Sequence, residues 1–331
     1  MISVVIPCYN AERTIGTTIA SALEQDVESE IIVVNDGSTD GSETIIRGFG
    51  DKIRGITTPN RGVSSARESG MRIARGAYIQ YLDSDDLLTP GTLGARVRAL
   101  GQHQADVAHT DWQKLKREEN GNTALGDIMR PNLFAIERDV EAATATSEFW
   151  APPAALLYRR EIVDRIGGWH TGLPVIQDAR YLFEAARHQA RFVYVPTVGA
   201  YYNLREDSLS RRNLKQFIAD CSRNTTEIEA LWRARGTLSP SRVNALARMW
   251  DHVVKAALLN GLDEFEDARA GYNRLLPRRG TFEAGYFLRR MIGAKATSSV
   301  LRTVLRSKQT LLGRQLLQAV GSRNRGNVSV S

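Results

Sequence analysis

Short apolar runs alternate with helical-period stretches along the first two hundred residues. The apolar runs are bounded by Gly, Pro, Asn or Asp, and they have the length and composition of buried strands. We expect strands at Ile2–Ile6, Ile31–Val34, Ile53–Thr57, Tyr78–Leu82, Asp106–Trp112, Ala154–Tyr158 and Arg191–Pro196. Apolar residues recur at helical spacing between most of these runs, as in Ile15, Ile19, Ala22 and Leu23. Alternating strands and helices predict an α/β, Rossmann-like fold with a mostly parallel sheet flanked by helices.

The pattern changes along the rest of the chain. Residues 114–127 are polar, and they are typical of a hairpin or a surface loop. From Leu214 onward the pattern is helical throughout, ending in a basic amphipathic stretch from Phe282 to Val320. We therefore predict two parts, an α/β domain at 1–210 and a helical C-terminal region with a basic tail at 211–331.

Composition agrees with a folded protein. The chain has 331 residues, of which 42% are hydrophobic and 24% charged, which suits a sizeable core. No apolar run is long enough to span a bilayer, and Met1 leads directly into a strand without a signal sequence, so a cytoplasmic location is expected. Cys8 and Cys221 lie far apart and are expected to be free thiols.

Positive charge is concentrated in the tail. The chain carries a net charge of +7, and from Arg278 onward eleven basic residues face one acidic residue, Glu283. Phe287, Ile292, Leu301, Leu305 and Leu312 lie between the basic residues. This arrangement suits peripheral contact with an anionic membrane at its inner face, and it fits a solvated helical bundle with a charged face equally well. No aromatic and basic platform for nucleic acid is present in the folded part.

Three carboxylates follow one predicted strand in the stretch AYIQYLDSDDLLTP, at Asp83, Asp85 and Asp86. Open α/β sheets bind ligands beyond the carboxyl ends of their strands. Neighbouring carboxylates repel one another unless water, hydrogen bonds or a divalent cation compensates. An acidic turn that caps the next helix is the alternative, and we assign that capping role to Asp86.

Other polar loops also follow strands and should meet the acidic turn at one edge of the sheet. Tyr9 offers a ring to a base, and Asp36 an acceptor for a base hydrogen. Arg61 and Arg67 offer guanidinium groups to phosphate. Taken singly, Tyr9 could be a packing residue, Asp36 could form an Asx turn before Gly37, and Arg67 could be a solvated charge on a helix. Taken together, these residues favour a site for a nucleotide diphosphate.

The motifs VVIPCYNAERTIGTTIASAL, EIIVVNDGSTDGS, NRGVSSARESGMRIARGAYIQYLDSDDLLTP, GGW and QDARYLFEAARHQARFVYVP resemble the family 2 glycosyltransferases with the GT-A fold. The resemblance covers about residues 2–210. It implies inverting transfer of a sugar from a nucleotide-sugar donor, often a UDP-sugar, to a hydroxyl of a glycan or lipid-linked acceptor, with Mg or Mn. It also implies site roles: the base on Pro7, Tyr9 and Asp36, the diphosphate near Arg67, the ribose or sugar near Asp83, and the metal on Asp85.

A second acidic motif of the family usually reads Glu-Asp shortly after a Gly-Gly-aromatic turn. Here it reads Gln177-Asp178. Inversion needs one carboxylate that takes the proton from the attacking hydroxyl, and we assign this general base to Asp178. A helix N-cap is the alternative role for Asp178. The replacement of Glu by Gln leaves open how the base is oriented.

Weaker candidates complete the predicted site. The segment YYNLREDSLSRR resembles a loop that closes over the diphosphate, which makes Arg205 and Ser208 candidates, whereas a polar linker is the alternative. Trp112 and Trp150 lie where the family receives its acceptor, and core packing would explain them equally well. The lone histidines His109 and His170 are expected to be structural.

Other functions fit less well. The turn PCYNAE after the first strand contains no glycine, which argues against a dinucleotide-binding fingerprint, and no P-loop is present. A non-catalytic module that binds a nucleotide-sugar or glycan remains the alternative. The presence of Asp83, Asp85 and Asp178 argues against it.

Overall fold

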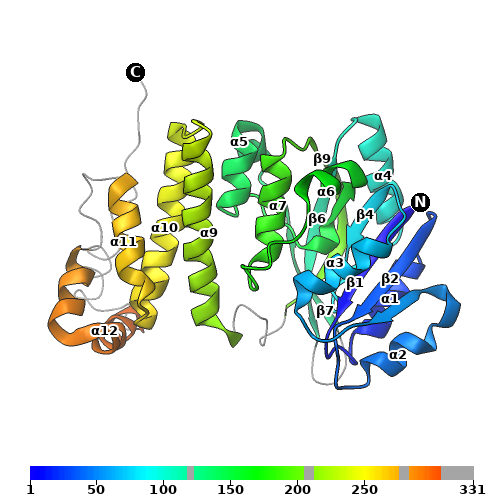
Figure 1. Cartoon of the computed structure of the whole chain (residues 1–331), viewed down its shortest axis with the longest axis horizontal. Helices are drawn as coiled ribbons and strands as arrows, with labels where there is room; N and C mark the ends of the chain where they lie inside the picture. The colour runs from blue at the N-terminus through cyan, green and yellow to red at the C-terminus, as the bar shows by residue number, and fades with distance from the viewer. Residues whose placement is uncertain (118–122, 205–211, 276–282, 307–331) are drawn as a thin grey trace. The chain divides into compact units, whose positions relative to one another are not determined.

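The computed structural model describes residues 1–117, 123–204, 212–275 and 283–306 (Figure 1). The chain divides into two compact units, Met1–Arg212 and Asn213–Ser331. Each unit is described by itself below.

Unit 1 contains one large sheet. Its strands within the described residues are β1 (Ile2–Cys8), β2 (Ser29–Asn35), β3 (Arg54–Thr57), β4 (Tyr78–Tyr81), β5 (Leu87–Leu88), β6 (Val107–Arg117), β7 (Thr123–Met129), β8 (Leu156–Arg159) and β9 (Phe192–Asn203). They follow the order β3-β2-β1-β4-β8-β6-β9-β5, and β7 pairs with β6. Every residue of β1 is buried, as expected for a central strand covered on both faces.

The sheet is mixed. β3, β2, β1 and β4 pair in parallel, as alternating strands and helices predict. β8 then runs antiparallel to both β4 and β6, and β5 runs antiparallel to β9, while β6 and β9 are parallel. The predicted α/β fold class is therefore confirmed, but the sheet is mostly parallel only in its first half. The direction of a strand depends on its connections, and the apolar runs do not encode it.

Helices flank this sheet on both sides (Figure 1). They are α1 (Ile15–Leu23), α2 (Ser42–Gly48), α3 (Val63–Ile73), α4 (Thr92–Gln102), α5 (Leu133–Ala145), α6 (Arg160–Ile166) and α7 (Gln177–Arg187), with short 3-10 turns η1 (Gly50–Lys52) and η2 (Pro153–Ala155). The hairpin expected in residues 114–127 is confirmed by the β6–β7 pair. The helix α5 was not predicted, and its backbone is interrupted at Asp139, where φ is −164°.

A buried arginine, Arg96, joins three strands of the sheet through hydrogen bonds. Arg96 in α4 donates to Gln80 Oε1 (2.7 Å), Thr110 Oγ1 (3.1 Å) and the carbonyls of Ala154 (2.9 Å) and Gly199 (3.0 Å). Burial lowers the pKa of Arg96 to about 9. A Cβ at Gly199 would collide with the guanidinium, so glycine is needed where β9 approaches Arg96. These bonds fix β4, β6 and β9 relative to one another, and all three strands contribute to the site below.

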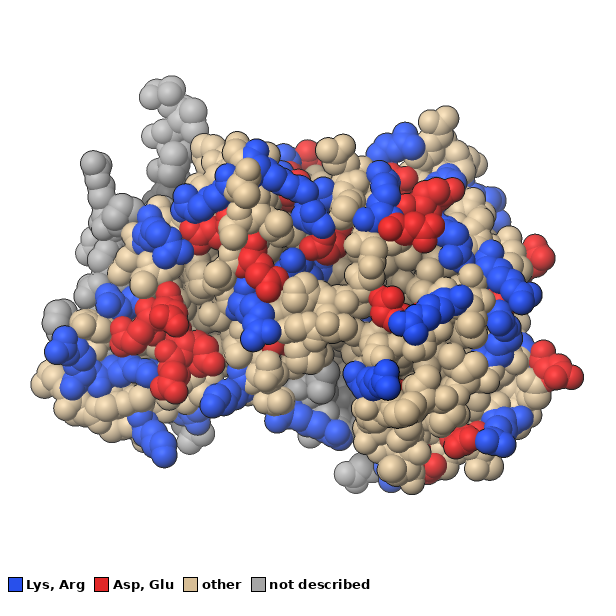
Figure 2. Space-filling model, viewed as in Figure 1, with Lys and Arg blue, Asp and Glu red and all other residues tan. Residues whose placement is uncertain are grey.

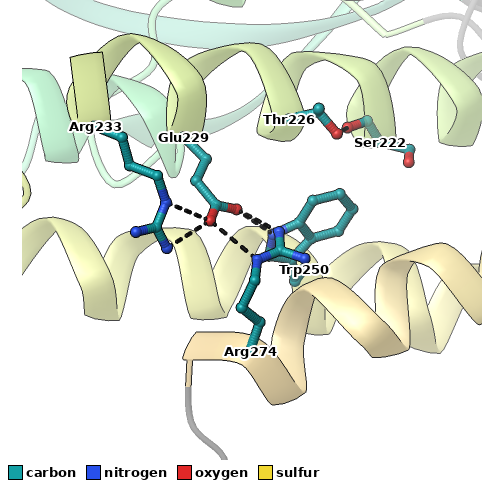
Figure 3. A network of polar contacts seen from close by, with 6 residues as sticks. All are labelled: Ser222, Thr226, Glu229, Arg233, Trp250 and Arg274. Carbon is teal, nitrogen blue, oxygen red and sulfur yellow. Dashed lines mark hydrogen bonds and ion pairs between the residues drawn. The ribbon is translucent and has the colours of Figure 1, made fainter.

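Unit 2 is helical, with α9 (Leu214–Ala234), α10 (Pro240–Asn260), α11 (Glu264–Leu275) and α12 (Glu283–Arg306). Figure 3 shows a polar network in which Glu229 of α9 accepts from Arg233 (2.9 Å), from Arg274 of α11 (3.0 Å) and from the indole of Trp250 of α10 (3.4 Å). Burial raises the pKa of Glu229, but the hydrogen bonds from these side chains outweigh burial and hold it below its usual value. The carboxylate therefore connects three helices while remaining charged.

Part of the basic tail is used inside unit 2. Arg302 of α12 donates to the carbonyl of Leu259 (2.8 Å) and to Asn260 Oδ1 (2.7 Å), and Arg289 donates to the carbonyl of Leu262 (2.8 Å). These guanidinium groups satisfy carbonyls at and just beyond the end of α10, where positive charge is favourable. Leu301 is buried in the helical core. Basic residues of the tail thus have a structural role within the described part of the chain.

The charged surface, the hydropathy of the helices and the two cysteines bear on membrane insertion and on nucleophilic chemistry. Lys and Arg are interspersed with Asp and Glu on the face drawn in Figure 2. Among the described residues, no helix has the length and hydropathy needed to cross a bilayer. Both cysteines are free, as predicted, and burial raises the pKa of Cys8 to about 11. Cys8 is therefore a protonated thiol at neutral pH and a poor nucleophile.

Candidate active site

The first loops of the site follow β1 and β2. Pro7 is buried within β1, and Tyr9 follows it with 50% of its surface exposed. Asn10 after it has a positive φ of 49°, and its Oδ1 accepts from the backbone amide of Thr39 (2.8 Å), which joins the two loops. Tyr9 is thus an exposed ring on a loop that is held in place.

Asp36 holds the start of α3. Its carboxylate accepts from the backbone amides of Arg61 (3.0 Å) and Gly62 (2.8 Å), and its side chain is buried. The local Asx-type turn is made by Asn35, whose Oδ1 accepts from the amide of Ser38 (3.0 Å). The alternative of an Asx turn at Asp36 is therefore wrong. Asp36 links the ends of β2 and β3.

The acidic turn separates its three carboxylates. The amide of Asp86 donates to the carbonyl of Asp83 (3.1 Å), which closes a tight turn directly after β4. Asp83 and Asp85 are half-buried, whereas Asp86 is buried and its Oδ1 accepts from the amide of Asn203 in β9 (2.9 Å). Burial, with the neighbouring Asp85 and Asp83, raises the pKa of Asp86 well above its usual value. Asp86 therefore braces the turn against β9.

The predicted helix cap at Asp86 is wrong. The N-cap position of α4 is occupied by Gly91, which has a positive φ of 71°. The acidic turn is separated from α4 by the short strand β5. A strand of two residues is too short to show an alternating or apolar pattern. The sequence therefore predicted that the turn lies directly before the helix.

Arg67 of α3 is buried, which rules out a solvated helix charge. Its Nη2 pairs with Asp83 Oδ1 (2.5 Å), and its guanidinium lies 4.1 Å from the ring centre of Trp169. Its Nε and Nη1 are buried and have no hydrogen-bond partner in the structure. Unsatisfied guanidinium donors are costly, and an anionic oxygen is the group that such donors bind best.

The sequence did not reveal the aromatic support of Arg67. Trp169 stacks on Tyr181 with centroids 4.1 Å apart and an interplanar angle of 11°, and the amide of Trp169 donates to Glu68 Oε1 (2.6 Å). Tyr181 lies within hydrogen-bond distance of the hydroxyl of Tyr81 (3.3 Å). The sequence feature that contains Trp169 is the GGW motif, and the sequence predicted only a tight turn there.

Asp178 lies in the first turn of α7. The N-cap position is Ile176, so the N-cap alternative for Asp178 is wrong, although the carboxylate of Asp178 accepts a hydrogen bond from the backbone amide of Ala179 in this turn. Trp150 Nε1 donates to Asp178 Oδ2 (3.3 Å). Burial raises the pKa of Asp178, nearby Asp83 raises it further, and Arg67 acts in the opposite direction. The structure therefore brings Asp178, Asp83 and Arg67 within electrostatic reach of one another.

Trp150, which bonds to Asp178, belongs to a cluster of three aromatic rings. Trp112, Trp150 and Tyr202 meet edge to face, with centroids 5.4 to 5.8 Å apart. Trp112 is buried, which agrees with core packing, and Trp150 is partly buried. Tyr202 was missed from the sequence. Its pKa is raised by burial and then by Asp86, Asp178, Asp83 and Asp85, so all four carboxylates act on this one hydroxyl.

The acidic turn suits a divalent cation that is shared with a ligand. Within the described part of the chain, no group of three or more His, Cys, Asp and Glu side chains could hold a metal by itself. With Asp86 turned inward, Asp83 and Asp85 remain as carboxylates at the rim. Mg²⁺ sites commonly combine one or two carboxylates with substrate phosphates and water. The residues therefore fit a cation bound together with a diphosphate.

The remaining candidates are Arg205, Ser208 and His109. Arg205 and Ser208 fall outside the residues that the structure describes. His109 is buried between Phe149 and Tyr194, and burial lowers its pKa to about 4, so it is a neutral structural residue as expected.

The α/β sheet and its flanking helices have the GT-A fold of their solved structural neighbours. Residues 3–167 match the family model described as Glycosyl transferase family 2. The uncharacterized glycosyltransferase EpsJ of Bacillus subtilis is 36% identical over 173 residues, which are 50% of this chain and 49% of EpsJ. The chain belongs to glycosyl transferase family 2, and its match spans about half the length of that relative.

Two solved structures share the fold. TarS of S. aureus in complex with UDP-GlcNAc aligns with a TM-score of 0.56 at 18% identity, covering 83% of this chain and 88% of that one. The mannosyltransferase PcManGT of Pyrobaculum calidifontis in complex with GDP-Man and Mn2+ aligns with a TM-score of 0.56 at 17% identity, covering 96% and 83%. At this level of identity the likeness concerns the fold.

Proposed function

We propose that this chain transfers a sugar from a nucleotide-sugar, most simply a UDP-sugar, to a hydroxyl group of a glycan or lipid-linked acceptor, with inversion at the anomeric carbon. The observation that carries the proposal is the convergence of Asp178, Asp83 and Arg67 at the end of β4. TarS, a structure with the same fold, is in complex with UDP-GlcNAc, which supports this donor class.

The donor would lie along the strand ends. Tyr9, near Pro7, stacks on the base. Asp36 already accepts hydrogen bonds from two backbone amides, and its remaining lone pairs accept a hydrogen bond from the base. The diphosphate takes the two unpartnered donors of Arg67. Asp83, held by Arg67 Nη2, faces the ribose or the sugar. Arg205 and Ser208 stay candidates for contacts to the diphosphate.

Asp178 is the general base of the proposed reaction. The acceptor hydroxyl gives its proton to the Asp178 carboxylate while its oxygen bonds to the anomeric carbon. The bond from that carbon to the diphosphate oxygen breaks, its electron pair leaves with the nucleoside diphosphate, and the configuration inverts. The raised pKa of Asp178 suits this role, because a stronger base accepts the proton more readily.

A divalent cation, Mn or Mg, would be held by Asp85 together with the donor diphosphate. When bound, it neutralises negative charge that develops on the leaving diphosphate. The mannosyltransferase with this fold is in complex with GDP-Man and Mn2+, which supports such a cation. The buried Asp86 holds the acidic turn in place through its bond to Asn203.

The acceptor would enter beside Asp178. Trp150 and Trp112 border this carboxylate, and a half-buried ring there can stack on the face of a sugar. Trp112 is more deeply buried, so contact with the acceptor falls mainly to Trp150.

The donor class can be tested by thermal melting of the full chain with UDP, GDP, TDP or CMP, each with and without Mn²⁺. A ligand at one hundred times its Kd stabilises the folded state by about 2.7 kcal/mol, so we expect UDP with Mn²⁺ to raise Tm by roughly 5 °C. GDP, TDP and CMP are the matched controls. A larger shift with another nucleotide would contradict the UDP assignment, and no shift with any of them would contradict the donor site.

The basic tail is proposed to contact an anionic membrane surface. Met291 and Ile292 of α12 are exposed, at 79% and 43%, beside Arg290. Exposed apolar side chains flanked by cations suit an anionic lipid surface. We expect vesicles with anionic phosphatidylserine to retain the full chain at low salt and to release it at high salt. Equal retention by neutral phosphatidylcholine vesicles, or none by either, would contradict the proposal.

A further inference from the structure

Asp178 needs a group that orients it, because the residue before it is Gln177 where the family usually has Glu. Gln177 is buried, and its Oε1 has no hydrogen-bond partner in the structure. A side-chain donor to Asp178 comes instead from Trp150, whose Nε1 lies 3.3 Å from Asp178 Oδ2. Trp150 lies just after α5, far from Asp178 in the sequence.

The orientation of the Trp150 ring is fixed by its neighbours. Its centroid lies 5.6 Å from that of Trp112 at 88° and 5.8 Å from that of Tyr202 at 83°. Trp112 and Tyr202 also meet each other edge to face, so the three rings form a closed cluster. A donor held by such packing presents its N–H in one direction, which a flexible side chain would not do.

We propose that Trp150 is the positioning residue of the catalytic base. Its N–H holds Oδ2 of Asp178 and acts together with the backbone amide of Ala179, which also bonds to this carboxylate. This inference rests on the proposed function and deepens it, because it assigns to an indole the orienting task that the replacement by Gln177 left open. The bond also stabilises the carboxylate form of Asp178.

The other groups that face Asp178 come from four elements. Arg67 of α3 carries positive charge, Asp83 after β4 carries negative charge, and Tyr158 of β8 and Tyr202 of β9 are buried phenols whose pKa values are raised by burial. The charges act over a distance, whereas the indole N–H is directional. Loss of that N–H should therefore change catalysis while donor binding is retained.

The test compares Trp150→Phe with Trp250→Phe in the full chain, because Trp250→Phe removes an indole N–H that is donated to Glu229 within unit 2. UDP release from UDP-GlcNAc with Mn²⁺, with water as the acceptor, gives kcat and KM for the donor. We expect Trp150→Phe to lower kcat roughly tenfold, as for the loss of one hydrogen bond to a charged group, with an unchanged donor KM. In a plot of kcat against pH, the rise on the acidic side should move to higher pH in Trp150→Phe. The lost hydrogen bond stabilised the ionised Asp178, so its loss raises the pKa of this base. Trp250→Phe should change neither.

Several outcomes would overturn the proposal. A Trp150→Phe enzyme with wild-type kcat and pH profile would show that the N–H is dispensable, and a change in KM alone would assign Trp150 to binding. If Trp150→Phe melts early, the sulfur isostere 3-benzothienylalanine at position 150 keeps the ring and removes only the N–H, and it should give the same tenfold loss. A wild-type chain that releases no UDP from any UDP-sugar would overturn the proposed function as well.

Discussion

Replacing Asp85 by alanine is expected to lower UDP-sugar turnover on the order of a hundredfold in the presence of Mn²⁺. A cation that neutralises charge on a leaving diphosphate is worth several kcal/mol, and about 1.4 kcal/mol corresponds to a factor of ten in rate. Asp85 is the carboxylate to which we assign the cation, because it lies half-buried in the acidic turn at the end of β4, where the donor diphosphate would bind. Its loss should also remove the dependence of UDP binding on Mn²⁺.

Calorimetric titration with UDP, with and without Mn²⁺, measures this effect on binding. Asp51→Ala removes an exposed carboxylate from η1 and is the matched control, which should bind UDP like the wild type. Asp85→Ala protein that still binds UDP more tightly with Mn²⁺ would contradict the metal assignment. Unchanged turnover would contradict it equally.

Periodicity predicted much of unit 1 because local pattern and burial agree there. Ile2–Ile6 and Ile31–Val34 became β1 and β2, each slightly longer than predicted. A fully buried strand must be apolar along its length, and an amphipathic helix must carry its apolar stripe, so both are visible in one sequence. The convergence of the loops then followed from the parallel first half of the sheet.

Long-range pairing could not be predicted in the same way. The antiparallel direction of β8 depends on how α5 and the β6–β7 hairpin return the chain to the sheet. Likewise, the sequence around Asp86 is typical of a turn. Its hydrogen bond from Asn203 forms only because β9 lies beside the acidic turn in the folded chain. Such contacts join residues more than one hundred positions apart, and a local pattern contains no information about them.

The sequence predicted the charged residues of the site together with Tyr9, Trp112 and Trp150, but it did not predict the roles of Trp169 and Tyr202. The charges were recognisable because carboxylates and arginines after strands are unusual. Trp169 and Tyr202 look like ordinary core residues in the sequence, since aromatic side chains are common in cores. Their role arises from geometry, in the stacking of Trp169 on Arg67 and in the position of Tyr202 among four carboxylates.

Asp178→Asn is expected to lower turnover roughly thousandfold, because general base catalysis typically contributes factors of about 10² to 10⁴. Asparagine keeps the size of the side chain and an oxygen that can accept from Trp150, but it cannot accept the proton. Donor binding should be unchanged, since Asp178 serves the acceptor. Asp164→Asn, an exposed carboxylate of the neighbouring helix α6, is the matched control.

The same substitution should not destabilise the fold. Burial raises the pKa of Asp178 in the folded state, so the folded protein favours the protonated form. Stability is therefore lost as the pH rises from the ordinary, unfolded pKa of aspartate toward the raised folded pKa, and this loss is present at neutral pH. A neutral asparagine removes it, so Tm at neutral pH should equal or exceed that of the wild type. Lost activity with a retained Tm would then reflect lost chemistry.

The most direct measurement of the central claim is UDP release by the wild-type chain and by Asp178→Asn over a panel of UDP-sugars with Mn²⁺. We predict turnover of at least one UDP-sugar by the wild type, and a loss of roughly a thousandfold in the variant with unchanged affinity for UDP. A wild type that turns over none of the donors would contradict glycosyl transfer from UDP-sugars, and an Asp178→Asn enzyme as active as the wild type would contradict the base.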